Sequence, residues 1–572
     1  MTIAHASSRM RRGYVATRHG LVHLRHAGHG PPVVLLHDSP RSSRLHEPLL
    51  AALADRFTLI ALDTPGYGNS APLRRDDALT IADFADALAE TLATLGLARV
   101  PIYGFHTSSK IALEYARRHP EQTGALILEG LSLPDEPTPE DFIARYMAPF
   151  KASDDGGYLA AQWTKIRDMH RFFPWFDLRA GTRMAMDMPS NAQLHDYSLD
   201  LFSAADHFAD AYAAAMRYRA APAIAGLRTP VVFCARPSDV LHGYLEALPQ
   251  PLPTGCRVES LPDAHQEWLG RLAELFAASH GPGPAPGFTL PDTLADTRHP
   301  VHGYRELAHG QVHLRFCRGS GSAAPILLLH DLPGAASQLD GLFDALAAAG
   351  RSVVLPELPG SGDSDPLATG ADASAYAVVL RQLGDALGID AFEVYASAGS
   401  AGLALQLACD QPPRVQRLTF EALPWLDAAR REATAERIAP AIEPRADGAH
   451  LLTAWHLLRD QQMAWPWYDT TAAAIRGITP QVAAADLHPA LLAMLKQLPH
   501  YGEAARASLR ADIIGLLPRL AMPVMLLERA GDARCAQAHE AKSLASGLLI
   551  RSVGPGISEL AALLLSNETG RA

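Results

Sequence analysis

Short apolar runs alternate with helical patterns along the first half of the chain. Five runs are apolar at nearly every position: Val33–Leu36, Thr58–Leu62, Val100–Tyr103, Ala125–Leu128 and Val231–Cys234. Runs that are apolar on both faces are typical of buried parallel strands. Between them, apolar residues recur at helical spacing in Pro48–Leu53, Ile81–Leu95 and Ser109–Arg118. This alternation predicts an α/β fold with a doubly wound, mostly parallel sheet, whose ligands bind above the carboxyl ends of the strands.

A long helical segment interrupts this alternation between Leu131 and Leu227. The segment is rich in aromatic and methionine residues, and its place after a strand end predicts a lid over that end of the sheet. Most of its aromatic side chains are expected to form the core of the lid itself. Some must face the pocket, and we expect Trp163, Phe173 and Trp175 to contact the substrate.

The second half of the chain repeats the first. VVLLHDSP (33–40) recurs as ILLLHDLP (326–333), and DTPGYGNS (63–70) recurs as ELPGSGDS (357–364). The offset between the copies is about 290 residues, which is long enough for a whole domain and too long for a solenoid repeat. The pattern therefore predicts a tandem duplication.

The repeat sets the expected domain boundaries. The first domain is predicted over residues 1–285, with its lid at about 132–227, and the second over 298–572, with its lid at about 423–520. The stretch GPGPAPGF (281–288) belongs to the predicted linker because it is rich in glycine and proline. We expect the halves to pack as an internal pseudo-dimer, and further homo-oligomerisation stays open.

Composition narrows the classes of partner. The chain has 572 residues, of which 48% are apolar and 19% are charged, and its net charge of −11 argues against a nucleic-acid partner. The five cysteines form no C-x-x-C pair, so the sequence predicts neither a disulfide framework nor a zinc–cysteine site. No stretch has the apolar length of a membrane span, and the N-terminus lacks the apolar run of a signal peptide. A cytoplasmic protein with a small-molecule substrate is expected.

The stretch PIYGFHTSSKIALEYARRHP (101–120) carries the most specific signal. It reads as a buried strand end, a turn of small residues and an amphipathic helix, which is the strand–turn–helix of a nucleophile elbow. Counting from Gly104 places His106 at the tip of this elbow. The tip usually has a positive φ, and histidine is among the few non-glycine residues enriched there. The pattern predicts an intact elbow with an imidazole in place of a hydroxyl.

With these motifs, both halves resemble the α/β-hydrolase superfamily, and the first half resembles a branch with an HTG-like elbow. The resemblance implies the order nucleophile, acid, histidine. It places the acid at Asp239 in ARPSD and the histidine at His265 in DAHQEW, after His106. It also implies an oxyanion hole formed by the backbone N–H groups of Thr107 and Ser39.

The loop after the first buried strand adds His37 and Asp38 to the expected substrate-binding residues. Asp38 stands where the superfamily usually has glycine, and Asp331 does so in the second half. Because both halves carry this aspartate, a structural role is favoured over a catalytic one.

The second half lacks the same catalytic set. Its elbow aligns Ala398 with the tip, Asp532 matches the acid, and the histidine position falls on Ile557. Ser400 could serve as a nucleophile only if the elbow shifted by two residues. The second half is therefore interpreted as a pseudo-enzyme.

Four hypotheses about the first half stay open. The first is hydrolysis of an ester, a lactone or a carbon–carbon bond beside a carbonyl, with a His265–Asp239 dyad as the general base that activates water. The second is base-initiated lyase, isomerase or cofactor-free oxygenase chemistry. In the third, His106, His265 and Asp239 bind iron or zinc, and the fourth is a non-catalytic binder. The first is preferred, with a small hydrophobic carbonyl substrate, no cofactor and no metal.

Overall fold

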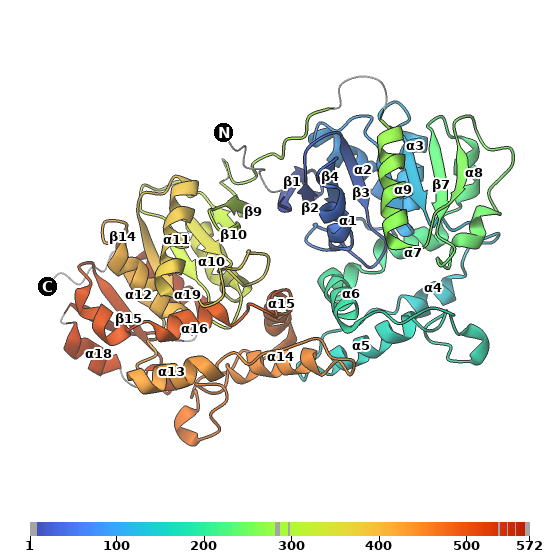
Figure 1. The fold of residues 1–572 in the computed structure, drawn as a ribbon. Coiled ribbons are helices and arrows are strands. Elements are labelled where there is room, and N and C mark those ends of the chain that lie inside the picture. Colours follow the sequence, from blue (N-terminus) through green and yellow to red (C-terminus); the bar gives the residue numbers. More distant parts are fainter. Residues whose placement is uncertain are drawn as a thin grey trace. The chain divides into compact units, whose positions relative to one another are not determined.

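The computed structural model describes residues 9–280, 286–295, 298–535, 538–545, 547–554 and 556–566. The central part of the predicted linker, 281–285, lies outside the described residues. The chain divides into two compact units, one formed by Met1–Lys151 and Gln162–Asp292 and the other by Ala152–Ala161 and Thr293–Ala572. Each unit contains one eight-stranded sheet (Figure 1).

The sheet of the first unit has the strand order β1-β2-β4-β3-β5-β6-β7-β8. Its strands are β1 (Arg11–Thr17), β2 (Gly20–Ala27), β3 (Pro32–Leu36), β4 (Thr58–Leu62), β5 (Ile102–Phe105), β6 (Leu126–Glu129), β7 (Val231–Ala235) and β8 (Arg257–Ser260). The first two pairs in this order are antiparallel and the others parallel. The predicted α/β fold and its five apolar strands are confirmed.

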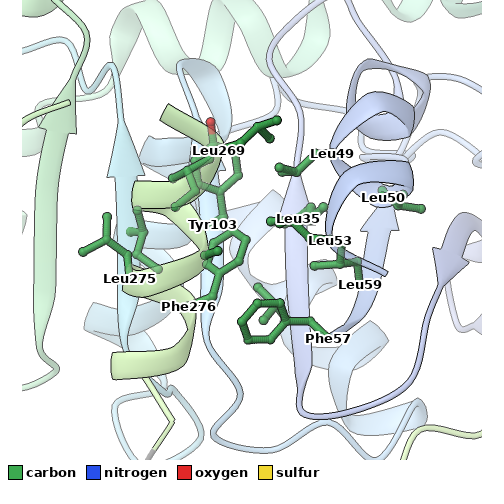
Figure 2. Close-up of a cluster of buried hydrophobic side chains, with 14 of the residues drawn as sticks. Leu35, Leu49, Leu50, Leu53, Phe57, Leu59, Tyr103, Leu269, Leu275 and Phe276 are labelled. Carbon is green, nitrogen blue, oxygen red and sulfur yellow. The ribbon is translucent and has the colours of Figure 1, made fainter. Parts of the chain in front are cut away.

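Helices cover both faces of this sheet. The helices of this half of the chain are α1 (Glu47–Leu53), α2 (Ile81–Thr94), α3 (Thr107–Arg118), α4 (Glu140–Tyr146), α5 (Gly157–Met169), α6 (Asn191–Ala204), α7 (Asp210–Arg217), α8 (Ala220–Ala225) and α9 (His265–Ala278), of which α4 to α8 lie in the insertion between β6 and β7. Helices α1 and α9 pack on one face (Figures 1 and 2). On the other face, Leu36 of β3 meets Phe84 of α2 and Ile111 of α3 around a small apolar void.

Figure 2 shows the core beneath α1 and α9. Leu49, Leu50 and Leu53 of α1 and Leu269, Leu275 and Phe276 of α9 are buried together against the sheet. Leu35, Leu59 and Tyr103 project from three parallel strands into the same cluster. Burying an aliphatic or aromatic side chain of this size contributes about 1.5–3 kcal/mol. This core fixes the strands whose carboxyl ends carry the candidate site.

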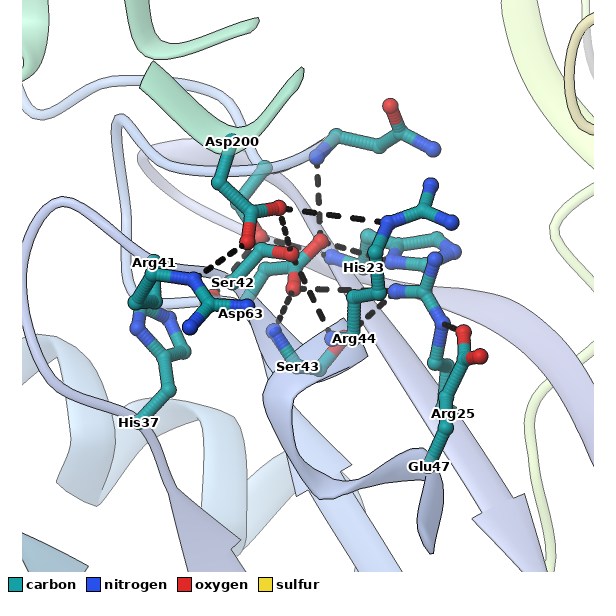
Figure 3. Close-up of polar contacts among 12 residues, drawn as sticks. His23, Arg25, His37, Arg41, Ser42, Ser43, Arg44, Glu47, Asp63 and Asp200 are labelled. Atoms are coloured by element: carbon teal, nitrogen blue, oxygen red, sulfur yellow. Dashed lines mark hydrogen bonds and ion pairs between the residues drawn. The ribbon is translucent and has the colours of Figure 1, made fainter. Parts of the chain in front are cut away.

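The lid of the first unit is tied to the loop after β3 by a buried polar network (Figure 3). Asp200 of α6 accepts hydrogen bonds from Arg41 Nε at 2.8 Å and from Ser42 Oγ at 2.6 Å. Nearby, Asp63 accepts from the Ser43 N–H and pairs with His23 Nδ1 at 2.7 Å. The network joins the loop between β3 and α1 to α6 and to strand β2.

The second unit repeats the topology, with strand order β9-β10-β12-β11-β13-β14-β15-β16. Its strands are β9 (Val301–Glu306), β10 (Gln311–Cys317), β11 (Ile326–Leu329), β12 (Val353–Pro356), β13 (Phe392–Ala396), β14 (Val415–Phe420), β15 (Val524–Glu528) and β16 (Leu548–Ser552). Its helices are α10 (Asp340–Ala348), α11 (Ala373–Leu387), α12 (Ala401–Asp410), α13 (Ala428–Arg437), α14 (Ala449–Asp460), α15 (Ala484–Leu495), α16 (Glu503–Arg510), α17 (Ile513–Leu516), α18 (Ala538–Leu544) and α19 (Ile557–Leu565). The predicted duplication is confirmed. In the described part of the chain, we find no helix with the length and apolarity needed to cross a bilayer.

Candidate active site

The predicted elbow is present in the first unit. Strand β5 ends at Phe105 and helix α3 begins at Thr107, so the chain turns at His106 alone. His106 has φ 50° and ψ −111°. Among the described residues, Arg99, His106 and Ala205 are the non-glycine residues with positive φ. A residue held in such a region costs about 1–3 kcal/mol and is characteristic of functional sites.

His106 pairs directly with Asp239. His106 Nε2 lies 2.8 Å from Asp239 Oδ2 at the end of the loop after β7. The other carboxylate oxygen of Asp239 accepts the Leu241 N–H at 2.8 Å. Because a carboxylate only accepts hydrogen bonds, Nε2 carries the ring proton and Nδ1 is left as the basic nitrogen. The structure thus places a histidine–carboxylate dyad at the elbow itself.

Gly130, immediately after β6, makes room for this pair. A Cβ atom at this position would lie 2.3 Å from His106 Cδ2 and 2.7 Å from His106 Nε2. The glycine also has φ +71°, which other residues rarely adopt. Neither the space nor the backbone conformation suits a side chain, so the glycine is part of the site.

The electrostatics of the dyad favour an ionised carboxylate beside a basic imidazole. Burial lowers the pKa of His106. The hydrogen bond and charge of Asp239 outweigh that effect, and the pKa of His106 is raised overall. Burial raises the pKa of Asp239, but the hydrogen bond and charge of His106 lower it below its ordinary value.

The predicted dyad of His265 with Asp239 is not what the structure contains. His265 is the first residue of α9, is exposed, and stacks on Trp268 with ring centroids 5.7 Å apart. Within the described ranges, no hydrogen bond joins His265 to Asp239, whose carboxylate is used by His106 and Leu241. The imidazole of His106 is longer than a serine side chain, so it reaches the Asp239 carboxylate and forms a hydrogen bond with it.

The serines that follow the tip are structural. Ser108 Oγ donates to the Leu36 carbonyl at 2.8 Å, and Ser109 Oγ donates to the Gly104 carbonyl at 2.9 Å. Both side chains are fully buried. In the second unit, Ser400 stands in the position of Ser108 and bonds the Leu329 carbonyl at 3.1 Å. These hydroxyl groups hydrogen-bond the elbow to the neighbouring strands and are not exposed to a substrate.

The two predicted oxyanion donors lie on the segments that converge on the tip. Thr107 opens α3, and Ser39 follows the strand end of β3. Within the part of the chain that the structure describes, the backbone N–H groups of Ser39 and Thr107 have no hydrogen-bond acceptor. Unpaired N–H groups that converge beside a base are what an oxyanion hole requires.

His37 lies in the same loop but has a structural role. Its Nδ1 donates to the Asp38 carbonyl at 2.7 Å, and its Nε2 accepts the Thr64 N–H at 2.9 Å. His330 makes the equivalent bonds in the second unit. With both ring nitrogens committed to the backbone, His37 cannot bind a substrate as the sequence analysis expected.

The three predicted lid contacts lie in different environments. Trp163 is 2% exposed and belongs to the core of the lid. Phe173 is 53% exposed and packs against Tyr146, with centroids 5.7 Å apart. Trp175 donates its indole N–H to the Tyr146 carbonyl at 3.0 Å. Of the three, Phe173 has the exposed ring that a substrate contact needs.

Sequence reasoning missed a group of lid tyrosines near Asp38. Burial raises the pKa of Tyr197 and of Tyr212, which lie near Asp38. The ring of Tyr146 lies 5.9 Å from that of Tyr212. Tyrosines set among the apolar positions of α6 and α7 were the available signal. Tyr197 and Tyr212 thus place two phenol groups of the lid near Asp38.

Glu129 supports the dyad from behind the elbow. Its buried carboxylate accepts from Tyr103 Oη at 2.9 Å, from Arg236 Nε at 2.8 Å and from Trp268 Nε1 at 3.1 Å. Its backbone carbonyl accepts the His106 N–H at 2.9 Å. Glu129 therefore links the tip of the elbow to Arg236, which begins the turn that carries Asp239.

The second unit has a filled site. Its tip, Ala398, is 1% exposed, and the preceding Ser397 has an ordinary φ of −64°. The carboxylate of Asp331 accepts the Leu332 N–H at 3.0 Å and the Gly399 N–H at 2.6 Å. These N–H groups are the counterparts of those of Ser39 and Thr107, so a carboxylate occupies the position of an oxyanion.

The buried guanidinium of Arg534 completes this filling. It lies 2.9 Å from Asp532, 3.4 Å from Asp331 and 3.5 Å from Glu421. The histidine position, Ile557, is the first residue of α19 as His265 is of α9. The polar groups of this site thus satisfy one another.

A set of side chains with metal-ligand geometry occurs in the second unit. Ligand atoms of His313, Glu357 and Asp363 lie within 4.8 Å of one another. Lys496 Nζ is 2.7 Å from Asp363 Oδ2 and already supplies a positive charge. At the elbow, His265 does not join His106 and Asp239, so the three ligands considered from the sequence are not brought together.

Comparisons with known proteins agree with this architecture. The family model described as alpha/beta hydrolase fold matches residues 31–243 and 324–437, more than half of the chain. The protein therefore belongs to the α/β-hydrolase family, and the match in both halves supports a tandem arrangement.

Individual relatives match only in part. A proline iminopeptidase of Xylella fastidiosa is 34% identical over 109 residues, covering 18% of this chain and 33% of that protein. A pimeloyl-[acyl-carrier protein] methyl ester esterase of Nitrosomonas europaea is 31% identical over 107 residues, covering 19% and 40%. The matched region thus spans about a third of the length of these curated relatives. The solved structure of an esterase from Exiguobacterium antarcticum aligns with a TM-score of 0.37 and 18% identity, over 46% of this chain and 98% of that one.

Proposed function

We propose that the first unit is a hydrolase of small, hydrophobic carbonyl compounds, namely esters, lactones or ketones with a scissile carbon–carbon bond. The observation that carries the proposal is the 2.8 Å contact between His106 Nε2 and Asp239 Oδ2 at the elbow tip. A histidine oriented by a carboxylate is a general base that works near neutral pH. The hydrolase names of the matched relatives support the reaction class.

In this mechanism, His106 Nδ1 removes a proton from a water molecule as the water attacks the substrate carbonyl. The developing oxyanion accepts hydrogen bonds from the backbone N–H groups of Ser39 and Thr107. Asp239 stabilises the imidazolium that forms and holds the ring in the reactive tautomer. The imidazolium then returns its proton to the leaving group, which closes the cycle without an acyl-serine.

A second candidate is base-initiated lyase, isomerase or cofactor-free oxygenase chemistry. It is favoured by the fact that Ser108 and Ser109 are buried and bonded to carbonyls, which leaves the elbow a base and no hydroxyl nucleophile. Such reactions need only a base and an oxyanion site, and His106 with the two N–H groups would supply both.

Turnover of a panel of 4-nitrophenyl esters and simple lactones tests the proposal. The wild-type chain should hydrolyse members of the panel, and His106→Gln should lose about 10²–10⁴-fold in kcat because the general base is gone. Ser400→Ala, a change in the second unit, is the matched control and should leave turnover unchanged. If the wild-type chain turns over none of these compounds but exchanges an acidic C–H of a ketone with deuterium from solvent, the second candidate replaces the first.

A further inference from the structure

The side chain of Asp38 has no part in the mechanism above, although it lies beside the oxyanion donors. Asp38 immediately precedes Ser39, whose N–H is one of the two donors. Its Oδ1 is buried and, in the described part of the chain, makes no hydrogen bond. A buried, ionised carboxylate oxygen without a hydrogen-bond partner costs free energy. We therefore expect this oxygen to carry a proton or to contact a ligand.

The second unit shows how far a side chain at this position reaches. Asp331 is the counterpart of Asp38, and its Oδ1 bonds the N–H groups of Leu332 and Gly399. Those N–H groups correspond to the donors at Ser39 and Thr107. The carboxyl group of Asp38 therefore has the length and attachment needed to contact an oxygen atom held in the oxyanion hole.

Asp38 and Asp331 differ in the residue that lies near their carboxyl groups. Arg534 Nη1 lies 3.4 Å from Asp331 Oδ2 and forms an ion pair with it. The turn that carries Arg534 is repeated in the first unit with Leu241 in its place, because the N–H groups of Arg534 and Leu241 bond Asp532 and Asp239 in the same way. Leu241 offers no positive charge.

The charged groups that face Asp38 in the first unit have other hydrogen-bond partners. They are Arg41, His106, His37 and Asp200. Arg41 Nε is bonded to Asp200 at 2.8 Å, and His106 is bonded to Asp239. Burial raises the pKa of Asp38 against the lowering influence of Arg41 and the two histidines, and the net shift is upward.

We propose that Asp38 is a third hydrogen-bond donor of the oxyanion site and acts in the neutral carboxylic acid form. Its O–H would donate to the substrate oxygen as negative charge develops there, beside the N–H groups of Ser39 and Thr107. A carboxylic acid kept neutral by its surroundings can serve an oxyanion hole in this way. The inference rests on the oxyanion site of the proposed function, and it holds for hydrolysis and for proton abstraction alike.

Infrared difference spectroscopy tests the protonation state without any substrate. The spectrum of the wild-type chain minus that of Asp38→Asn, at pH 7, should contain the C=O stretch of a protonated carboxyl group. Asp331→Asn is the matched control and should give only carboxylate bands, because Asp331 forms an ion pair with Arg534. Carboxylate bands from Asp38 as well would overturn the proposal.

Kinetics tests the donor role. Asp38→Ala should lose about 10²–10³-fold in kcat, the usual effect of removing one oxyanion donor, whereas Asp38→Asn should stay within about tenfold because its amide donates too. A rise in kcat in Asp38→Ala would show that Asp38 is an anion competing with the substrate, and would overturn the proposal. Leu241→Arg provides a further variant: it should ionise Asp38, replace the protonated-carboxyl band by carboxylate bands and abolish turnover. If the wild-type chain turns over no substrate, the proposed function fails, while the infrared result still decides the state of Asp38.

Discussion

Replacing Asp239 by asparagine tests the dyad most sharply. In the structure, Asp239 Oδ1 accepts the Leu241 N–H at 2.8 Å and Oδ2 pairs with His106 Nε2 at 2.8 Å. In the variant, the amide oxygen must stay on the Leu241 N–H, because an NH₂ group cannot accept that bond. The amide NH₂ then faces His106 Nε2 and donates to it.

This reversal removes the base without removing the imidazole. When Nε2 accepts a hydrogen bond, the ring proton moves to Nδ1, the nitrogen that has to take the proton from water. Loss of a general base lowers the rate by about 10²–10⁴-fold. At about 1.4 kcal/mol for each factor of ten, this is about 3–5.5 kcal/mol of transition-state stabilisation. The side chain keeps its shape, so the loss should fall on kcat rather than on folding.

The assay is kcat and KM on the best ester of the panel, with thermal unfolding as a check of folding. His265→Ala is the control, since His265 is exposed and stacks on Trp268 outside the dyad. That variant should keep wild-type turnover. If His265→Ala abolishes turnover while Asp239→Asn retains it, the reasoning from the His106–Asp239 contact is refuted.

Four further outcomes follow from the geometry. Gly130→Ala should lose most activity, because the added Cβ would lie 2.3 Å from His106 Cδ2. Gly96→Ala is the control: Gly96 has a similar positive φ but open space around it, so this variant should keep its activity. Equal activity in both variants would contradict the packing argument. A fluorophosphonate should leave the chain unlabelled, and labelling at Ser108 would show that the elbow register is wrong. The value of kcat/KM should rise with pH as His106 loses its proton, with a midpoint above the ordinary pKa of histidine; a midpoint below that value would contradict the raised pKa. Asp200→Ala leaves the half-buried guanidinium of Arg41 without its carboxylate partner, so it should lower the free energy of unfolding by about 1.5–3 kcal/mol and raise KM; an unchanged free energy of unfolding would show that the lid is anchored elsewhere.

Much of the architecture could be predicted from apolar patterning. The five strands from Val33 to Cys234 begin and end within about two residues of their expected bounds. Strands buried on both faces are apolar at nearly every position, which makes them easy to locate in the sequence. The elbow was predictable for a different reason: Gly104, His106 and the serines that follow fit only a tight turn. The position of Asp239 followed from the strand before it.

The pairing within the site could not be predicted in the same way. Family order assigned Asp239 to His265, and only the three-dimensional arrangement shows that the ring of His106 reaches the carboxylate first. The contact between Arg41 and Asp200 joins residues 159 positions apart, and no local pattern in the sequence reports such a pair. Side-chain reach and long-range packing decided these features.

Matched positions in the two copies differ together. Gly130, which leaves room for His106, is replaced in the second unit by Ala422, and the small tip Ala398 is buried against it.

The charged residues of the two sites differ together with the tip residue. Leu241 is replaced by Arg534, which neutralises Asp331 and Asp532 where no imidazole stands between them. The positive φ at the tip is confined to the first copy among the described residues. Backbone strain persists only where surrounding contacts enforce it, and the Asp239 hydrogen bond is the contact that the second copy lacks. Strain, glycine and open oxyanion donors thus occur together in one copy and are absent together from the other, which is the pattern expected if His106 is the working group of this protein.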